Sequence, residues 1–440
     1  MENEDLKPIF ADEDLPTNAK IIVIGVGGGG SNAVNGMLND KNEEVDYWVF
    51  NTDSQALANS PCDNKLILGK NVTRGLGAGG NPEMGQKAAE DSYNDIKLVI
   101  HGADMVFIAA GEGGGTGTGA APVVAKVAKE EGCLVIGIVT RPFTFEGKAR
   151  KHNALEGINN LRQYVDALIV VSNDKMMFNN GSLGIRNAFA ASDEILAQSV
   201  KTVTDLILVH GVINLDFADV KATLEGKGLA LIGIGYGEGE NKAIDAATNA
   251  ISSPLLETSI RGSKSMILNI TVGDDTTLDD VQYAINYITE SAGGRENDVN
   301  IIFGVQNDDS FHSKMKIAII ATDFTRDIDV DQLDTAYNRS ISSFNNNGMN
   351  SMPEEPSTPV MKEETPIRSV VKEEIKEDRE RSVLPDYLRD FFAEDNQPSR
   401  PATESVQENS HNDPTTTFKR VDSEVVDDDE DDAIVVERKY

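Results

Sequence analysis

Gly-Glu-Gly-Gly-Gly-Thr-Gly-Thr-Gly, residues 111–119, stands between a short apolar run, Met105–Ile108, and a helical pattern that starts near Ala120. Because six of these nine residues are glycine, backbone N–H groups and threonine hydroxyls can approach a ligand closely. A flexible linker or a tight turn also uses glycine. At a junction between a strand and a helix, however, orphan N–H groups and the helix dipole favour an anion. The segment therefore predicts a phosphate-binding loop, best suited to a polyphosphate.

The same order of strand, glycine loop and helix occurs near the amino terminus. The apolar run Lys20–Val26 is followed by Gly27–Asn32 and then by a helical pattern over Ala33–Leu38. Three further apolar runs are expected to be strands, each followed by polar residues: Asp46–Phe50 before Asn51–Asp53, Leu134–Val139 before Thr140–Pro142, and Ala167–Val171 before Ser172–Asp174. Strands that alternate with helices predict an α/β fold with a doubly wound, mostly parallel sheet. The polar groups are expected along its ligand-binding edge.

A long helix is expected to separate this sheet from a second, smaller α/β domain. Apolar residues recur at helical spacing from Gly184 to Leu208. The strand candidates beyond it are Leu229–Ile234, Met266–Val272, Asn300–Phe303 and Lys316–Ala321, with helices expected near Asn241–Ser252 and Leu278–Glu290. These patterns predict a mobile arm (residues 1–18), a first domain (19–183), a central helix (184–208) and a second domain (209–326).

Composition changes abruptly after about Arg326. The last 114 residues hold 29 acidic and 13 basic residues but a single glycine. So much charge with so little apolar content predicts a disordered acidic C-terminal tail. Residues 383–392, Val-Leu-Pro-Asp-Tyr-Leu-Arg-Asp-Phe-Phe, form an apolar island inside it. Such an island is typical of a partner-binding peptide, although a chance cluster gives the same pattern. It divides the tail into a linker (327–382), the peptide and an acidic extension (393–440).

Charge and cysteine content exclude several classes of function. A formal net charge of −33 argues against nucleic-acid binding and against direct contact with an anionic membrane. Cys62 and Cys133 are too few for a disulfide framework, and none of the five histidines has another at the i, i+4 spacing of a zinc site. The acidic N-terminus and the lack of an apolar run of about 18 residues predict a cytoplasmic protein without membrane insertion.

The glycine pattern alone leaves two kinds of nucleotide site open. Gly25, Gly27 and Gly30 match G-x-G-x-x-G after a strand, and Asp53 follows 23 residues after Gly30, as in a nicotinamide-dependent dehydrogenase. A second and richer loop at residues 113–119 suits a longer phosphate chain better. Neither G-x-x-x-x-G-K-[ST] nor N-K-x-D occurs in the sequence, so the chain is not a P-loop ATPase or GTPase. The base must be recognised by other means.

Residues 113–119 resemble the nucleotide loop of the tubulin/FtsZ family. Three further segments resemble its FtsZ branch: Asn-Thr-Asp at 51–53, Thr-Arg-Pro-Phe-Thr-Phe-Glu-Gly at 140–147 and Asn-Leu-Asp-Phe-Ala-Asp-Val at 214–220. The resemblance extends from about Ala19 to Phe324. It implies a GTP-binding domain at 19–183, a GTPase-activating domain at 209–326, and subunits that stack head to tail with nucleotide between them.

The resemblance also implies roles for individual residues. Phosphate and nucleoside contacts would come from Gly28, Gly29, Gly30, Ser31 and Asn32, outer-phosphate contacts from Gly115, Thr116 and Gly117, ribose contacts from Glu146 and Arg150, base stacking from Phe189, and guanine recognition from Asp193. A carboxylate can accept hydrogen bonds from N1–H and the N2 amine of guanine, which adenine does not offer in that arrangement. Without the resemblance, a solvated helix face is the favoured interpretation of Asp193. Magnesium is expected with GTP, and its ligands are unknown.

Asn214, Asp216 and Asp219 are the expected catalytic residues, although they follow the long helix that leads away from the nucleotide edge. A head-to-tail contact would bring them from one subunit to the nucleotide of the next. Paired carboxylates there can orient and polarise the attacking water, while Asn214 adds a hydrogen bond. Helix capping is the alternative role for Asp216, and it does not exclude catalysis.

The sequence departs from the family pattern at three places. Glu112 occupies a position that is usually apolar, so its carboxylate must point away from the phosphates or form an ion pair. The segment between Asn173 and Phe189 is slightly short. Residues 384–389 resemble the family's partner-binding tail peptide, which normally ends the chain, yet 51 residues follow Arg389.

The expected function is that of a GTPase whose filaments form the division ring at mid-cell. Division proteins that bind residues 383–392 would tether these filaments to the membrane. A tubulin-like filament that segregates plasmids is the alternative within the same fold, and a dehydrogenase is the alternative outside it.

Overall fold

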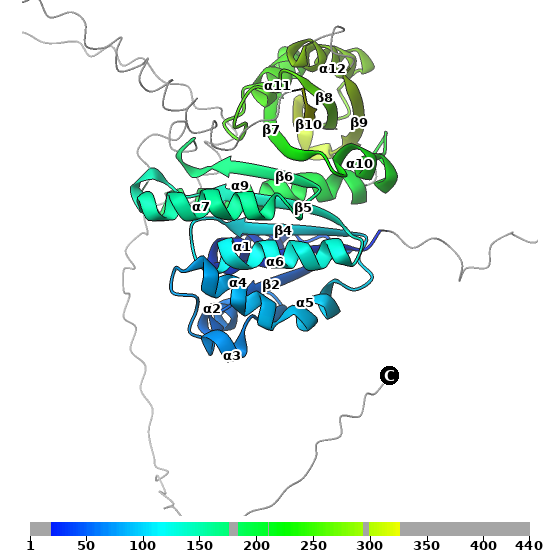
Figure 1. The fold of residues 1–440 in the computed structure, drawn as a ribbon. Coiled ribbons are helices and arrows are strands. Elements are labelled where there is room, and N and C mark those ends of the chain that lie inside the picture. Colours follow the sequence, from blue (N-terminus) through cyan, green and yellow to red (C-terminus); the bar gives the residue numbers. More distant parts are fainter. Residues whose placement is uncertain (1–18, 176–183, 210, 294–298, 326–440) are drawn as a thin grey trace, which may run out of the picture. The chain divides into compact units, whose positions relative to one another are not determined.

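The computed structural model describes residues 19–175, 184–209, 211–293 and 299–325 (Figure 1). The arm predicted at residues 1–18 lies outside these ranges. So do the linker, the peptide at 383–392 and the acidic extension.

The first part of the fold is a parallel sheet with helices on both faces. Its strands are β1 (Ile21–Val26), β2 (Val45–Asn51), β3 (Asn64–Ile67), β4 (Met105–Gly111), β5 (Leu134–Arg141) and β6 (Ala167–Ser172), in the order β3-β2-β1-β4-β5-β6. All of these neighbours pair in parallel. In β1, Ile21 and Val23 enter the core on one face, while Ile22 and Ile24 enter the core on the other. Burial on both faces explains why the strands appear as continuous apolar runs.

The helices divide between the two faces of this sheet. Those with residues in the core of Ile21 and Val23 are α1 (Gly27–Met37), α2 (Ser54–Asn59), α9 (Ile185–Leu208) and α10 (Phe217–Leu224). The core of Ile22 and Ile24 contains residues of α4 (Pro82–Asp91), α5 (Tyr93–Ile100), α6 (Thr116–Glu130) and α7 (Lys148–Leu161). The short α3 (Lys70–Thr73) and the 3-10 turns η1 (Leu38–Asp40) and η2 (Thr144–Glu146) lie in connections. The doubly wound architecture is confirmed.

The second part continues the same sheet with mixed strand directions. It contains β7 (Gly228–Glu238), β8 (Ser263–Val272), β9 (Asn300–Asn307) and β10 (Lys314–Phe324), in the order β7-β10-β8-β9. The strand β10 is antiparallel to β7 and β8, whereas β8 and β9 are parallel. Residues Gly228–Ala230 of β7 pair with β6, which joins the two parts into one ten-stranded sheet.

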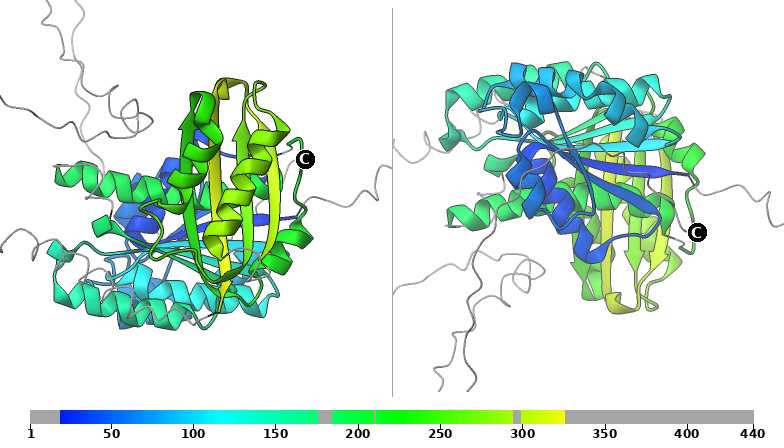
Figure 2. Two further views of the ribbon diagram at one scale, coloured as in Figure 1. Left: turned by 90° about the horizontal axis from the view of Figure 1, so that it is seen from above. Right: turned by 90° about the horizontal axis from the view of Figure 1, so that it is seen from below.

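Helices also cover the second part (Figure 2). Residues of α11 (Lys242–Ile251) and α12 (Leu278–Ala292) share a core with β8 and β10, while α10 (Phe217–Leu224) follows the long helix. The 3-10 turns η3 (Gly239–Asn241) and η5 (Asp309–Phe311) lie near the strand ends. None of the described helices has the length and apolar character that a membrane crossing needs.

The long helix α9 packs between the two parts. Its buried residues Leu196, Val200 and Val203 belong to one core that includes Ile138 of β5 and Ile320 of β10. The helix therefore packs against strands from both halves of the sheet. The predicted central helix is therefore present, and it is held on both sides.

Two helices begin earlier than the sequence predicts. The helix α1 starts at Gly27 rather than after Asn32, and α6 starts at Thr116 rather than near Ala120. At Gly27 the chain turns sharply with a φ of 73°. A Cβ on Gly30 would lie 2.1 Å from the carbonyl oxygen of Ala109. The glycines thus permit the first turn of α1 to pack against β4, which a pattern of glycines alone does not reveal.

Candidate functional site

The two glycine-rich segments meet at the carboxyl edge of the parallel sheet. A Cβ on Gly27 would lie 2.7 Å from the backbone nitrogen of Gly117, and one on Gly117 would lie 2.6 Å from the carbonyl oxygen of Gly111. The N-termini of α1 and α6 are therefore close neighbours, and only glycine allows this approach. Nothing lies within 4 Å of a Cβ built on Gly28 or Gly114. Paired helix N-termini with open space in front of them suit a phosphate chain.

Hydroxyl groups add hydrogen-bonding capacity at this edge. The hydroxyls of Thr52 and Thr116 are 2.7 Å apart, which links the end of β2 to the start of α6. The N–H of Gly113 donates to Oγ1 of Thr118 at 2.8 Å and shapes the glycine loop. Oγ of Ser31 is buried and has no hydrogen-bond partner among the described residues. Because such a group is unfavourable unless satisfied, Ser31 is available to a ligand.

Glu146 and Arg150 form an ion pair at the side of the site. Nη1 of Arg150 donates to Oε2 of Glu146 at 2.6 Å, and the N–H of Phe143 donates to Oε1 of the same carboxylate at 2.9 Å. The side chain of Arg150 is exposed, so the pair adds little stability. The ion pair fixes the orientation of Glu146, the last residue of η2.

An aromatic cluster lies next to this pair. Phe143 stacks on Phe145 with ring centroids 5.0 Å apart, and both rings meet Phe189 of α9 edge to face. Phe143 is buried, whereas Phe145 and Phe189 are exposed. Exposed aromatic surface over a buried ring can pack against a planar base. The sequence identified Phe189 but not Phe143 or Phe145 as site residues, although both follow the strand-ending Pro142.

Asp193 lies one turn beyond Phe189 on α9 and contacts α1. Nδ2 of Asn32 donates to Oδ2 of Asp193 at 3.0 Å. Oγ of the preceding residue, Ser192, donates to Oδ1 of Asn173 at 2.7 Å. Burial raises the pKa of Asp193 to about 6, and the hydrogen bond from Asn32 opposes this shift. The structure therefore brings the predicted phosphate, ribose and base residues to one edge.

The three predicted catalytic residues lie elsewhere. From Asp193 to the last residue of α9, Leu208, the helix rises by roughly 22 Å at about 1.5 Å per residue. Asp216 then caps α10 by accepting a hydrogen bond from the N–H of Asp219 at 2.8 Å, and Oδ1 of Asn214 accepts one from the N–H of Gly211. Asn214, Asp216 and Asp219 are all exposed. Within one copy they do not reach the nucleotide edge.

Glu112 points into the helix layer. It is 4% exposed, and neither carboxyl oxygen has a hydrogen-bond partner. Oε2 lies 2.3 Å from the position that a Cβ on Gly157 of α7 would occupy, beside the methyl group of Thr118. Burial raises the pKa of Glu112 to about 8, opposed by the nearby Thr118. The sequence left two alternatives for Glu112, a side chain that points away from the phosphates or an ion pair. Among the described residues the side chain points away and forms no ion pair.

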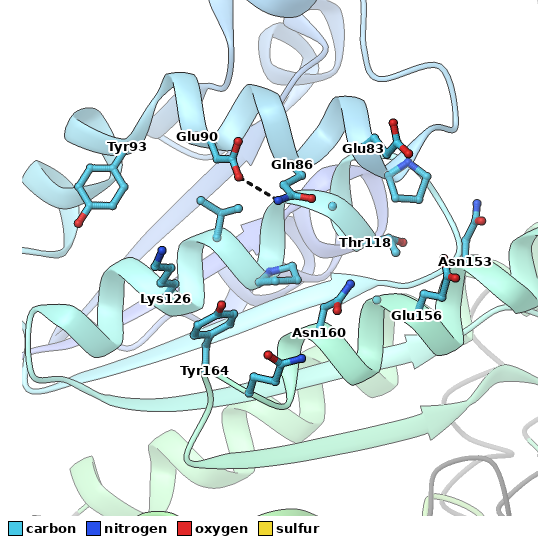
Figure 3. A pocket seen from close by; sticks show the side chains of 16 residues that line it. Glu83, Gln86, Glu90, Tyr93, Thr118, Lys126, Asn153, Glu156, Asn160 and Tyr164 are labelled. Carbon is cyan, nitrogen blue, oxygen red and sulfur yellow. Dashed lines mark hydrogen bonds between the residues drawn. The ribbon is translucent and has the colours of Figure 1, made fainter.

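A cavity of about 360 Å³ lies between α4, α6 and α7 (Figure 3). Its walls carry mainly polar side chains, among them Glu83, Gln86, Glu90, Asn153, Glu156 and Asn160. None of the residues predicted to hold nucleotide lines it. The cavity adjoins the glycine loop only through Thr118 and Gly119, so it is separate from the nucleotide edge.

Across the described residues, no three His, Cys, Asp or Glu side chains gather as metal ligands would. Cys62 and Cys133 are buried free thiols.

Each part of the fold matches a known protein family. Residues 20–180 match the description "Tubulin/FtsZ family, GTPase domain", and residues 228–325 match "FtsZ family, C-terminal domain". An empty FtsZ dimer from M. jannaschii is 40% identical, with a TM-score of 0.66, over 70% of this chain and 88% of that one. A mutant of FtsZ from the same organism gives the same identity and TM-score over 70% and 92% of the two chains.

A more distant structure shares the fold. CetZ2 from Haloferax volcanii, in a GTPγS-bound protofilament, is 21% identical over 74% of this chain and 99% of that one, with a TM-score of 0.60. The glycine-lined edge, the shared α9 core and the 40% identity to FtsZ all agree, and the chain belongs to the tubulin/FtsZ family of GTPases.

Proposed function

We propose that the protein is a division GTPase whose active centre is completed by a second copy of the chain. The observation that carries this proposal is the separation of the nucleotide edge from Asn214, Asp216 and Asp219 along α9. These exposed side chains have no nucleotide edge to act on within their own copy. A head-to-tail stack would supply it. The FtsZ dimer and the CetZ2 protofilament are relatives that self-associate, which supports the same arrangement here.

In this proposal the nucleotide lies across the edge from α6 to α9. Gly28, Gly29, Gly30, Ser31 and Asn32 hold phosphate and nucleoside, while Gly115, Thr116 and Gly117 hold the outer phosphates. Glu146 and Arg150 contact the ribose, Phe189 stacks on the base, and Asp193 reads guanine. The buried hydroxyl of Ser31 and the exposed rings of Phe145 and Phe189 support these assignments.

Magnesium is proposed as the companion of the triphosphate. Mg²⁺ keeps several waters and usually binds through substrate phosphates with few protein ligands. In this proposal the hydroxyls of Thr52 and Thr116 would lie next to the outer phosphates and the ion.

GTP is expected to start assembly, and assembly is expected to start hydrolysis. Light scattering should rise after GTP is added to the full chain, and GDP should give no rise. Phosphate release per molecule should increase steeply with protein concentration, because only stacked copies form a complete centre. A rate per molecule that stays constant on dilution would contradict the shared active centre.

The proposed cellular role is formation of the division ring at mid-cell, with tethering division proteins bound to residues 383–392. That segment lies outside the described residues, so its support is its sequence alone. A fluorescently tagged chain that forms a band at mid-cell would support division. Filaments that follow a plasmid would support segregation instead.

Lowering the pH below about 6 is expected to weaken GTP binding. Burial raises the pKa of Asp193 to about 6, so below this pH the carboxyl must lose a proton before it can accept both guanine donors. The dissociation constant should rise by up to about tenfold per pH unit below 6. Fluorescence titration with labelled GTP at pH 5.5, 6.5 and 7.5 measures this.

The control for that titration is Asp193→Asn. Phosphate groups of GTP also titrate near pH 6, and the variant keeps that contribution while it removes the carboxyl. The variant should bind GTP weakly at pH 7.5 and should show less pH dependence than the wild type. Equal pH dependence in the two proteins would exclude Asp193 as the group responsible.

A further inference from the structure

A buried ion network connects the two parts of the fold beside the aromatic cluster. Nη2 of Arg141, the last residue of β5, donates to Oε2 of Glu257 at 2.8 Å. Nζ of Lys175 lies 3.6 Å from the same oxygen and donates to the carbonyl oxygens of Leu256 and Glu257, each at 2.8 Å. Glu257 belongs to the connection between α11 and β8 in the second part of the fold.

The charge of Glu257 is almost completely removed from water. Its side chain is 1% exposed, and that of Arg141 is 9% exposed. Within the described ranges Oε1 of Glu257 has no hydrogen-bond partner, and the cations that balance this carboxylate there are Arg141 and Lys175. Burial lowers the pKa of Lys175, and Glu257 opposes that shift. Removing one member of such a network leaves uncompensated buried charge, which is strongly unfavourable.

Both cations belong to segments that position the loop formed by residues 142–147. Arg141 immediately precedes this loop. Lys175 follows Asp174, whose carboxylate accepts hydrogen bonds from the N–H and the hydroxyl of Thr144 at 2.9 and 2.5 Å. One carboxylate of the second part therefore holds both segments that support the loop, and the loop carries Phe143 and Glu146.

The same loop borders a pocket of about 250 Å³, whose lining includes Pro142, Phe143, Thr144 and Leu155. On its other contacts the loop is held by Asp174 and adjoins Arg141, so polar interactions set its position as well as the packing of Phe143.

We propose that Glu257 is a positioning residue for nucleotide binding. It lies in the second part of the fold and acts on the nucleoside side of the site through its contacts with Arg141 and Lys175. Glu257 does not touch the nucleotide in this proposal. It fixes the loop whose Phe143 supports Phe189 and whose Glu146 contacts the ribose. The inference rests on the proposed nucleotide site and adds that the second part of the fold sets its affinity.

The test is Glu257→Gln in the full chain, with Asp166→Asn as the matched control. Asp166 is also a buried carboxylate, 2% exposed and paired with Lys129 at 2.5 Å, but it lies at the opposite, amino-terminal end of β6. Dissociation constants for labelled GTP and GDP are measured at concentrations too low for assembly. Glu257→Gln is expected to raise both constants about tenfold, whereas Asp166→Asn should leave them unchanged despite a comparable loss of stability.

Steady-state turnover provides a second readout. Glu257→Gln should raise KM and leave kcat near the wild-type value, because the acids that follow α9 are untouched. Lys175→Gln leaves the contact between Arg141 and Glu257 in place, and its side chain is 20% exposed. That variant should raise the dissociation constants less, and it takes the place of Glu257→Gln if the latter does not fold.

Unchanged affinity in Glu257→Gln would overturn the inference. An equal rise in Asp166→Asn would also overturn it, since the effect would then be general destabilisation. The wild type is titrated first. If the wild type binds neither GTP nor GDP, the proposed nucleotide site is refuted. If the wild type binds and Glu257→Gln binds with the same affinity, only the role of Glu257 is refuted.

Discussion

Asp219→Ala is expected to lower GTP turnover by about 10²- to 10⁴-fold, the usual contribution of a group that orients or deprotonates a reacting water. GTP affinity should not change, because Asp219 lies beyond the far end of α9 from the nucleotide edge. Stopped assays of phosphate release and titration with labelled GTP separate the two quantities. A mixture with wild type should lose more activity than its composition implies, since each variant copy spoils the centre that it shares with a neighbour.

Two further variants separate catalysis from helix capping. Asp216→Asn keeps an N-cap for α10, because asparagine caps about as well as aspartate. Loss of turnover in that variant with an unchanged melting temperature would assign the effect to the carboxylate. Asp245→Ala removes an equally exposed acid from the first turn of α11 and should leave turnover unchanged. Normal turnover in Asp219→Ala and Asp216→Asn would remove both residues from the mechanism.

Glu112→Gln is expected to make the protein more stable at pH 8 but to change little at pH 5. Burial raises the pKa of Glu112 from an ordinary 4.5 to about 8, so the folded chain holds a proton that the unfolded chain releases between these values. Wild-type stability therefore falls as the pH rises through that range, by about 1.4 kcal/mol per pH unit from this group. Glutamine keeps the shape and has no proton to lose.

The measurement is the free energy of unfolding in urea, without nucleotide, at pH 5, 6, 7 and 8. The difference between Glu112→Gln and wild type should widen steadily with pH. Glu156→Gln on α7 serves as the control, because Glu156 is 65% exposed and should not shift the profile. Parallel profiles for wild type and Glu112→Gln would show that Glu112 does not titrate in this range.

The sequence predicted the parallel sheet well because its strands are buried on both faces and appear as unbroken apolar runs. It predicted α9 for a related reason, since the apolar residues of that helix recur at helical spacing and belong to the core that both halves of the sheet share. The start of α1 was wrong because glycine suggests a loop, whereas here it permits close packing against β4. The helices α4 and α5 and the strand β3 were not anticipated.

The candidate site was predictable only where a motif carried it. The glycine segments were predicted from their own pattern and Asp193 from the resemblance, but Phe143 and Phe145 were not named as site residues. The contact between Arg141 and Glu257 joins residues 116 positions apart, and no local pattern identifies such a pair. The role proposed for the acids after α9 needs a second copy of the chain, and contacts between copies leave no pattern in the sequence of one.

The core that α9 shares with both halves has a mechanical consequence for a polymer built from this protein. Because one core buries α9 together with strands of both halves, we expect the nucleotide edge and the acids after α9 to keep a constant spacing in each copy. Curvature of a filament would then arise at the contacts between copies. If the proposed shared centre is formed there, hydrolysis acts at the place where the filament bends.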